Sequence, residues 1–382
     1  MKYTRFLALA FIAVTLSMNM AAKDIKDVNA TLASLKKQYA PDSRTALMDV
    51  KASKGKDAII LEGSVSTQEL KNKIDEALAG EKIDNKVKVL ELAQTANRRW
   101  ALVKLAVATL RCEPKHSAEV ATQAIMGTPL KVLDKQGDWY RVQTPDDYIS
   151  FVPESSIIFC SADKMQQWRS SQRVIVTAMA TSLLEDPSSE YPVSDLVLGC
   201  ILQVQAQDGE WLTVVTPDGR KGYVKAEETA NLDEWKTQTF DAARIEHTAR
   251  MMTGCGYLWG GTSTKVSDCS GLVKVAYLSN GIILQRDASQ QALTGQKISD
   301  WHNCQLGDLL FFGNSKTGRV THVGLYLRDG KYIHCSGQVK INSLNKGDSD
   351  YLSSPLSISR INGQIGTRGI TTVAAHPWYC NQ

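Results

Sequence analysis

Charge bias and compositional bias are both absent from this chain of 382 residues. Lys and Arg number 44 against 40 Asp and Glu, so the formal net charge is only +4. A chain this near neutrality lacks the dense positive surface that grips a polyanion, and we expect no nucleic-acid partner. Hydrophobic residues make up 43% and charged residues 22%, which excludes a disordered tail, a collagen-like rod and a multi-span membrane protein.

Cysteine is missing from the first part of the chain, and no two cysteines form a C-x-x-C pair. The first is Cys112, so the lipid-attachment cysteine that usually follows a short N-terminal apolar run is lacking. Without C-x-x-C, a structural zinc site has weak support. The eight cysteines are also too widely spread to form the disulfide framework of a small secreted domain, although an oxidising compartment would permit pairing.

Long hydrophobic runs are missing too, apart from one short run near the start. Lys2 and Arg5 precede this run, and the small residues Ala21 and Ala22 follow it. This order is typical of a secretory signal peptide, and the run is too short for a comfortable membrane span. We expect residues 1–22 to be a cleaved signal peptide, and we expect an exported protein, periplasmic or secreted, without a membrane span.

The chain that follows divides into regions of different composition. Residues 24–98 are Lys-rich, and their patterns predict strands over 45–50 and 58–63, a helix over 68–79 and a strand over 86–92. This order indicates a small α+β domain that loosely resembles a BON-type domain. No candidate chemistry lies in it.

A ten-residue pattern then occurs twice, 72 residues apart. Each copy alternates as short strands do, with Gly-Asp or Asp-Gly turns and a central Trp. The pattern resembles a bacterial SH3 (SH3b) β-barrel, so we expect SH3b-like domains over residues 100–160 and 172–230. The first copy comprises Gly127, Leu130, Val132, Gly137, Trp139, Val142, Thr144, Pro145, Asp146 and Val152.

All the candidate chemistry lies after residue 240, beginning with Cys269. This cysteine follows a Gly-rich loop and precedes apolar residues spaced as on an amphipathic helix. We expect Cys269 to begin that helix, where free backbone N–H groups and the macrodipole lower a thiol pKa. Such a thiol is a nucleophile, whereas a buried structural cysteine is the alternative.

Two histidines lie on a predicted hairpin. Residues 320–327 alternate as a strand carrying His322, and His334 lies on the returning strand. With a two-residue loop the two side chains would face opposite sides of the sheet. With a three-residue loop that has Gly330 in the left-handed position, Gly324 pairs with His334, and the two histidines are diagonal neighbours on one face.

A thiol, a general-base imidazole and a polar residue that orients this imidazole are the parts of acyl-transfer catalysis. Cys269, His322 and His334 supply these parts. A Cys/His/His zinc site is one alternative, although zinc ligands usually cluster more tightly, and three unrelated core residues are another. We expect the catalytic set, with no metal and no organic cofactor.

Four segments of residues 240–340 together resemble the NlpC/P60 family of cysteine peptidases. The resemblance implies a papain-like α+β catalytic domain over residues 240–382 and hydrolysis of γ-D-glutamyl bonds in bacterial cell-wall peptides. It makes Cys269 the nucleophile, His322 the base and His334 the orienting residue, and Tyr257 would help to hold the oxyanion. The segments are Tyr257-x-Trp259-Gly260-Gly261, Asp268-Cys269-Ser270-Gly271, His322-Val323-Gly324 and His334.

Two SH3b-like domains before such a domain are similar to the γ-D-glutamyl-L-diamino acid endopeptidases, which act on freed peptides with an exposed L-Ala amine. The resemblance implies that Asp287 binds this amine, and that Glu119 and Tyr148 of the first SH3b copy reach over the cleft. The second copy has Arg220 in place of Tyr148 and receives no substrate role. The remaining residues expected to bind substrate are Asp268, Ser270 and Arg286.

We therefore expect a monomeric peptidase whose partners are peptidoglycan-derived peptides. Two other functions remain open from the sequence. One is a wall-lytic endopeptidase that uses the SH3b pair as wall anchors, and the other is a non-catalytic wall-binding protein.

Overall fold

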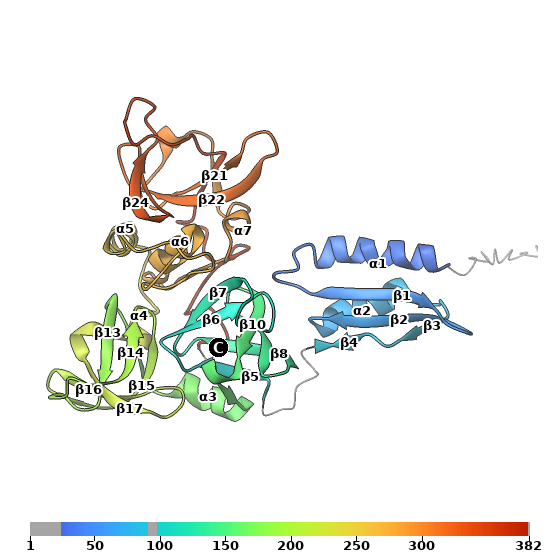
Figure 1. Ribbon diagram of the computed structural model, residues 1–382, viewed down its shortest axis with the longest axis horizontal. Helices are drawn as coiled ribbons and strands as arrows, with labels where there is room; N and C mark the ends of the chain where they lie inside the picture. Colours follow the sequence, from blue (N-terminus) through green and yellow to red (C-terminus); the bar gives the residue numbers. More distant parts are fainter. Residues whose placement is uncertain (1–23, 91–97, 381–382) are drawn as a thin grey trace, which may run out of the picture.

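The computed structural model describes residues 24–90 and 98–380, so the expected signal peptide lies outside the described residues. Figure 1 shows the N-terminal domain to one side, the two β-rich domains next to each other, and the C-terminal domain above them. Within the described ranges, no helix is long and apolar enough to cross a membrane.

The N-terminal domain places a sheet against two helices. Strand β1 runs antiparallel to β2, and β3 and β4 pair with β2 in parallel. The first helix was not predicted, because only Val28 and Leu32 of its side chains are buried and the apolar pattern is weak. The elements are α1 (Ile25–Tyr39), β1 (Met48–Lys54), β2 (Ile59–Val65), α2 (Gln68–Ala77), β3 (Ile83–Asn85) and β4 (Lys88–Val89).

The first SH3b-like domain is a seven-stranded sheet in the order β11-β5-β8-β9-β10-β6-β7. This hydrogen-bonded path does not return to its first strand within the described residues, so the expected barrel is an open one. Its elements are β5 (Trp100–Val103), β6 (Val107–Arg111), β7 (Val120–Ile125), β8 (Pro129–Gln136), β9 (Trp139–Gln143), β10 (Ile149–Pro153), η3 (Glu154–Ser156) and β11 (Ile157–Cys160), and helix α3 (Ala162–Ser170) follows.

The second SH3b-like domain repeats this sheet. Strands β15, β16 and β17 lie at the 72-residue offset from β8, β9 and β10, and the bulge between Val132 and Asp134 recurs between Val204 and Ala206. Its elements are β12 (Arg173–Val176), β13 (Ala180–Leu184), β14 (Pro192–Val197), β15 (Ile201–Asp208), β16 (Trp211–Val215), β17 (Lys221–Lys225), η4 (Ala226–Glu228) and β18 (Thr229–Asn231), and helix α4 (Leu232–Trp235) follows.

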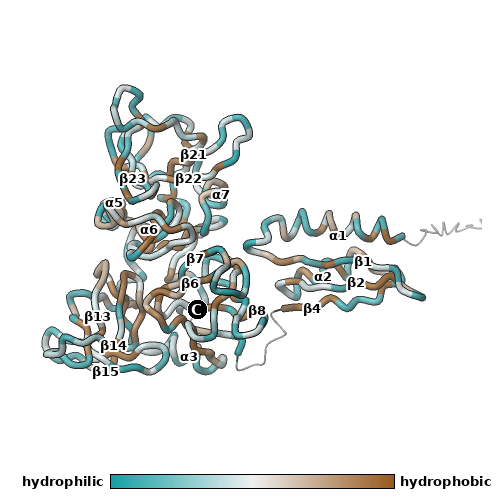
Figure 2. The backbone as a smooth tube through the Cα atoms, in the orientation of Figure 1, coloured by the Kyte–Doolittle hydropathy of each residue, from teal (hydrophilic) through white to brown (hydrophobic). Residues whose placement is uncertain are grey.

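The C-terminal domain packs a buried helix, α6, against a six-stranded sheet in the order β20-β25-β21-β22-β23-β24. Figure 2 shows hydrophobic residues concentrated inside the domains. The elements are α5 (Ala242–Met251), α6 (Cys269–Leu278), β19 (Ile282–Leu284), α7 (Ala288–Gln291), β20 (Gln296–Ile298), η5 (Trp301–Asn303), β21 (Leu309–Asn314), β22 (Arg319–Tyr326), β23 (Lys331–Ser336), β24 (Gln338–Ser343), β25 (Ser357–Arg360) and β26 (Ile370–Thr372).

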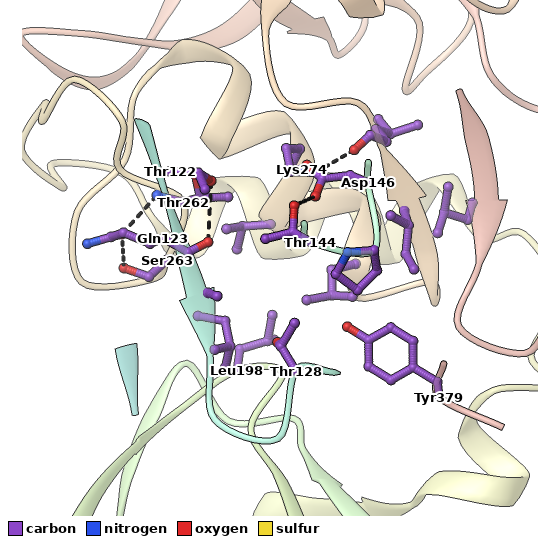
Figure 3. A pocket seen from close by; sticks show the side chains of 18 residues that line it. Thr122, Gln123, Thr128, Thr144, Asp146, Leu198, Thr262, Ser263, Lys274 and Tyr379 are labelled. Atoms are coloured by element: carbon purple, nitrogen blue, oxygen red, sulfur yellow. Dashed lines mark hydrogen bonds and ion pairs between the residues drawn. The ribbon is translucent and has the colours of Figure 1, made fainter. Parts of the chain in front are cut away.

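Polar contacts hold the first SH3b-like domain beside α6. Lys274 of α6 forms a 2.8 Å ion pair with Asp146, which follows β9, around a small cavity of about 90 Å³ (Figure 3). On the other side of this cavity, Gln123 of β7 accepts hydrogen bonds from the Thr262 N–H at 2.8 Å and the Ser263 hydroxyl at 2.9 Å. The first SH3b-like domain is therefore fixed next to the helix that begins at Cys269.

Candidate active site

Helix α6 begins at Cys269, as the sequence predicted, because Asp268 caps it. One carboxylate oxygen of Asp268 accepts the Gly271 N–H at 2.7 Å, and the other accepts the Gly260 N–H at 2.9 Å. The same carboxylate forms a 2.5 Å ion pair with Arg286, and both side chains are buried. The residue before the candidate nucleophile is thus fixed to the Gly-rich loop, to its own helix and to Arg286.

The Arg286 guanidinium donates hydrogen bonds to three neighbouring side chains. It donates to Asp268, to the Ser270 hydroxyl at 2.9 Å and to the Thr122 hydroxyl of β7 at 3.0 Å. Although burial disfavours its charge, the Asp268 carboxylate keeps the pKa of Arg286 above its ordinary value. Asp268, Ser270 and Arg286 line the cleft, but their contacts hold the start of α6 against the first SH3b-like domain.

The hairpin has the three-residue loop that the sequence allowed. Leu325 of β22 lies opposite Ile333 of β23, and continuing this register places Gly324 opposite His334. Gly330 has φ 73°, as expected, and Asp329 also has a positive φ of 54°. The two histidines consequently share one face of the sheet, where His322 Nε2 lies 2.7 Å from His334 Nδ1.

A hydrogen-bond chain continues from this pair to the neighbouring strand. His334 Nε2 lies 2.8 Å from the side-chain oxygen of Asn342 on β24, and the Asn342 amide nitrogen donates to the Asp350 carbonyl at 2.6 Å. A carbonyl only accepts, so it fixes the orientation of the Asn342 amide, and His334 must then donate from Nε2. His334 Nδ1 accepts from His322 Nε2, which leaves His322 Nδ1 free to take a proton.

Burial shifts the pKa of each reacting group toward its uncharged form. Burial, together with His334, lowers the pKa of His322 to about 4. Burial and the Asp268 carboxylate raise the pKa of Cys269 to about 11, although the Val323 and Ser270 N–H groups act in the opposite direction. The expectation of a lowered thiol pKa was therefore wrong in direction, because only 6% of Cys269 is exposed and desolvation outweighs its place at the helix start.

Cys269 lines a cleft of about 870 Å³ between the C-terminal and first SH3b-like domains. Tyr257 also lines it and keeps its phenolic proton, because burial and the neighbouring thiol raise its pKa to about 12. Asp287 lies in the same cleft and accepts a 3.0 Å hydrogen bond from the Tyr148 hydroxyl. Glu119 of the first SH3b-like domain accepts a 2.6 Å hydrogen bond from the Trp259 indole N–H.

Two residues of this site were missed by the sequence analysis. Asn342 extends the histidine pair, and an Asn eight residues beyond a histidine is no recognisable motif. Arg44 of the N-terminal domain lies 2.7 Å from Asp287, across 243 residues of chain. Only the tertiary fold brings Arg44 to the cleft.

The eight cysteines all lie within the described part of the chain and carry free thiols. Within residues 24–90 and 98–380, no group of three or more His, Cys, Asp and Glu side chains is arranged to hold a metal ion. The site is thus built from a thiol, two imidazoles and an amide on one α+β core, which is the class of papain-like cysteine peptidases.

Comparisons with known proteins agree with this class. Residues 254–354 match the NlpC/P60 family, and residues 110–157 match the bacterial dipeptidyl-peptidase Sh3 domain. The γ-D-glutamyl-L-lysine dipeptidyl-peptidase of Bacillus cereus is 31% identical over 228 residues, covering 56% of this chain and 67% of that protein. Dipeptidyl-peptidase 6 of Lysinibacillus sphaericus is 31% identical over 258 residues, which cover 64% of this chain and 92% of that protein. The chain belongs to the NlpC/P60 family.

A solved structure shares the fold. The crystal structure of an NlpC/P60 family protein from Bacillus cereus has a TM-score of 0.61 and 24% sequence identity, and it covers 68% of this chain and 99% of that one.

Proposed function

We propose that the protein is a cysteine peptidase that hydrolyses the bond between γ-D-glutamate and the following L-diamino acid in murein peptides with a free N-terminal L-Ala. The names of its relatives supply the bond and the substrate class. One observation carries the proposal. The same cleft is lined by Cys269, which begins a helix, and by Asp287, which is hydrogen-bonded to Tyr148. A nucleophile and an acceptor for an ammonium group then face one extended peptide.

Acylation begins with proton transfer from the Cys269 thiol to Nδ1 of His322. The thiolate attacks the γ-carbonyl carbon of D-Glu, and its oxygen becomes an oxyanion near the Cys269 N–H and the Tyr257 hydroxyl. As the intermediate collapses, the C–N bond breaks and the leaving amine takes the proton from His322. The product that stays bound is a thioester on Cys269.

Deacylation uses the same groups in reverse order. His322 takes a proton from water, the hydroxide attacks the thioester carbonyl, and the thiolate leaves and recovers its proton from His322. The dipeptide L-Ala-γ-D-Glu is then released with a free γ-carboxylate. No metal or organic cofactor takes part in either half-reaction.

The requirement for a free amine follows from Asp287 and Tyr148 in the same cleft. An ammonium donates three hydrogen bonds, and Asp287 offers it a carboxylate. Acetylation removes the charge of the amine, and the carboxylate loses its charged partner in the complex. Glu119 holds the Trp259 indole N–H with one carboxylate oxygen, and its second oxygen can accept a hydrogen bond from the ammonium.

The test compares L-Ala-γ-D-Glu-L-Lys with its N-acetyl derivative, with the products identified by mass spectrometry. We expect kcat/KM to fall by more than tenfold on acetylation. Equal values would favour the wall-lytic endopeptidase instead. Absence of cleavage of both peptides and of intact wall would favour a non-catalytic protein.

We also propose that the enzyme works outside the cytoplasm, as residues 1–22 suggest. Fractionation of the source cells should recover the mature chain in the periplasm or the medium, with its new N-terminus near Ala22. Recovery of the uncleaved chain in the cytoplasm would contradict export.

A further inference from the structure

A turn of the N-terminal domain enters the cleft at the proposed amine pocket. The turn lies between α1 and β1, and it carries Arg44. A guanidinium nitrogen of Arg44 donates to Asp287 Oδ2 at 2.7 Å, and the same nitrogen lies 3.2 Å from the Ser289 hydroxyl. This oxygen of Asp287 also accepts the Tyr148 hydroxyl. The carboxylate to which we assign the substrate ammonium therefore already has a cation bound to it.

Two further sets of contacts show that this placement is built into the fold. Asp42 binds the guanidinium of Arg44 with both carboxylate oxygens, at 2.8 Å each, and Gln290 of α7 donates to Asp42 at 2.8 Å. The backbone of the turn is held as well, because the Arg44 carbonyl accepts the Ile149 N–H of β10 at 2.7 Å. Gln143 of β9 donates to the next carbonyl, that of Thr45, at 3.2 Å.

The chemistry of the contact is that of a substrate amine. A guanidinium and an ammonium are both cations that donate N–H to a carboxylate, so they compete for the Asp287 carboxylate. We propose that Arg44 is a specificity-determining residue of the cleft, a tethered competitor that the free amine of the peptide must displace from Asp287. This inference rests on the proposed function, because it takes Asp287 as the amine site.

The contact is suited to reversible displacement. The Arg44 side chain is 39% exposed and the Asp287 side chain 26%, and ion pairs this exposed contribute little net stability. Asp42 can stay paired with the Arg44 guanidinium after this guanidinium leaves Asp287, so Arg44 is not left as an unpaired charge. An acetylated N-terminus offers no cation to replace Arg44, so an acetylated peptide leaves the Arg44–Asp287 pair in place. Only the free peptide therefore has to displace Arg44, and only its binding should change when Arg44 is removed.

The first test measures kinetics with Arg44→Ala and Lys37→Ala in the full chain. Lys37→Ala is the matched control, because it removes an exposed cation from α1 of the same domain. For L-Ala-γ-D-Glu-L-Lys we expect Arg44→Ala to lower KM about threefold to tenfold and to leave kcat within twofold. Its KM for the acetylated peptide should not change. An unchanged or increased KM for the free peptide would overturn the inference and make Arg44 a structural or substrate-binding residue.

The second test does not depend on turnover. It uses Cys269→Ala in the full chain, with and without Arg44→Ala, and the dipeptide L-Ala-γ-D-Glu as the probe. Calorimetry should give a lower Kd when Arg44 is absent, and hydrogen exchange at the Ile149 amide should accelerate on binding only when Arg44 is present. Equal Kd values and unchanged exchange at Ile149 would exclude displacement.

The two failures are distinguishable. If the proposed function is wrong, neither the wild type nor Arg44→Ala cleaves the free peptide, and the dipeptide does not bind. If only the inference is wrong, both proteins cleave it with equal KM.

Discussion

At the scale of single residues, burial favours the uncharged forms of the Cys269 thiol and the His322 imidazole. The pKa of Cys269 at about 11 and that of His322 at about 4 both favour the uncharged pair at neutral pH. The nucleophile is then generated when His322 removes its proton during attack, and a preformed ion pair is not required. This neutrality could not be predicted from sequence, because the helix-start pattern around Cys269 says nothing of how deeply the fold buries the thiol.

Replacing Cys269 should abolish cleavage while leaving the fold intact. Cys269→Ala and Cys269→Ser remove the thiol, and we expect kcat/KM for L-Ala-γ-D-Glu-L-Lys to fall by about 10³-fold or more. Cys304→Ser is the matched control, since Cys304 lies outside the cleft lining. Activity within tenfold of wild type in either Cys269 variant would remove this residue from the mechanism.

The amide of Asn342 should set the pH at which the histidine pair loses activity. His322 must be neutral to accept a proton, so activity is present above its folded-state pKa and is lost as the pH falls toward about 4. In Asn342→Asp a carboxylate replaces an amide 2.8 Å from His334, which raises the proton affinity of the pair. We expect the acidic limb of kcat/KM to move to higher pH by about one unit, measured as an apparent value for the pair.

Asn362→Asp provides the control for this pH profile, because it makes the same chemical change at an exposed position. An acidic limb that stays in place in Asn342→Asp, or moves equally in both variants, would rule out Asn342 as the partner that orients His334.

At the scale of elements, the start of α6 depends on one buried carboxylate. Asp268 caps the helix and pairs with Arg286, of which only 1% is exposed. In Asp268→Asn the cap is kept but Arg286 becomes an unpaired buried charge, which costs about 3–5 kcal/mol of unfolding free energy. Asp241→Asn makes the same change at the cap of α5, where the Asp241 side chain is 44% exposed, and should cost less than about 1 kcal/mol. Urea unfolding followed by circular dichroism compares the two, and equal losses would show that the Arg286 pair is unimportant.

The elements differ in how well the sequence predicted them. The hairpin register follows from the loop length. Gly330 favours the three-residue loop because glycine adopts a positive φ easily. The repeat located strands in both SH3b-like domains, since side chains that alternate between core and solvent leave a two-residue period. Helix α1 has no such clear pattern, because it packs only one narrow face on its sheet. The Arg44 contact has no local signal at all, since it joins surfaces of two domains.

At the scale of the whole molecule, two copies of one domain have diverged in use. In the first copy, Tyr148 donates to Asp287 in the cleft. In the second, Arg220 stands at the equivalent position and donates to the Lys104 carbonyl at 2.7 Å and to the Val193 carbonyl at 3.3 Å. Arg220 therefore joins the two SH3b-like domains, while Tyr148 joins the first of them to the catalytic domain.

This divergence predicts different results for the two positions. Tyr148→Phe removes only the hydroxyl, and the loss of a hydrogen bond to a carboxylate costs about 1.5–3 kcal/mol, which is on the order of tenfold to a hundredfold in kcat/KM for L-Ala-γ-D-Glu-L-Lys. The acetylated peptide, which does not use the charge of Asp287, should lose much less. Arg220→Ala should leave kcat/KM for both peptides within twofold and lower Tm, because its contacts hold two domains together. The opposite result would be that Tyr148→Phe lowers kcat/KM equally for both peptides, or that Arg220→Ala lowers it as much as Tyr148→Phe does. The first SH3b-like domain would then have no special part in recognising the amine. Anchoring to the wall would become the better account of the two SH3b-like domains.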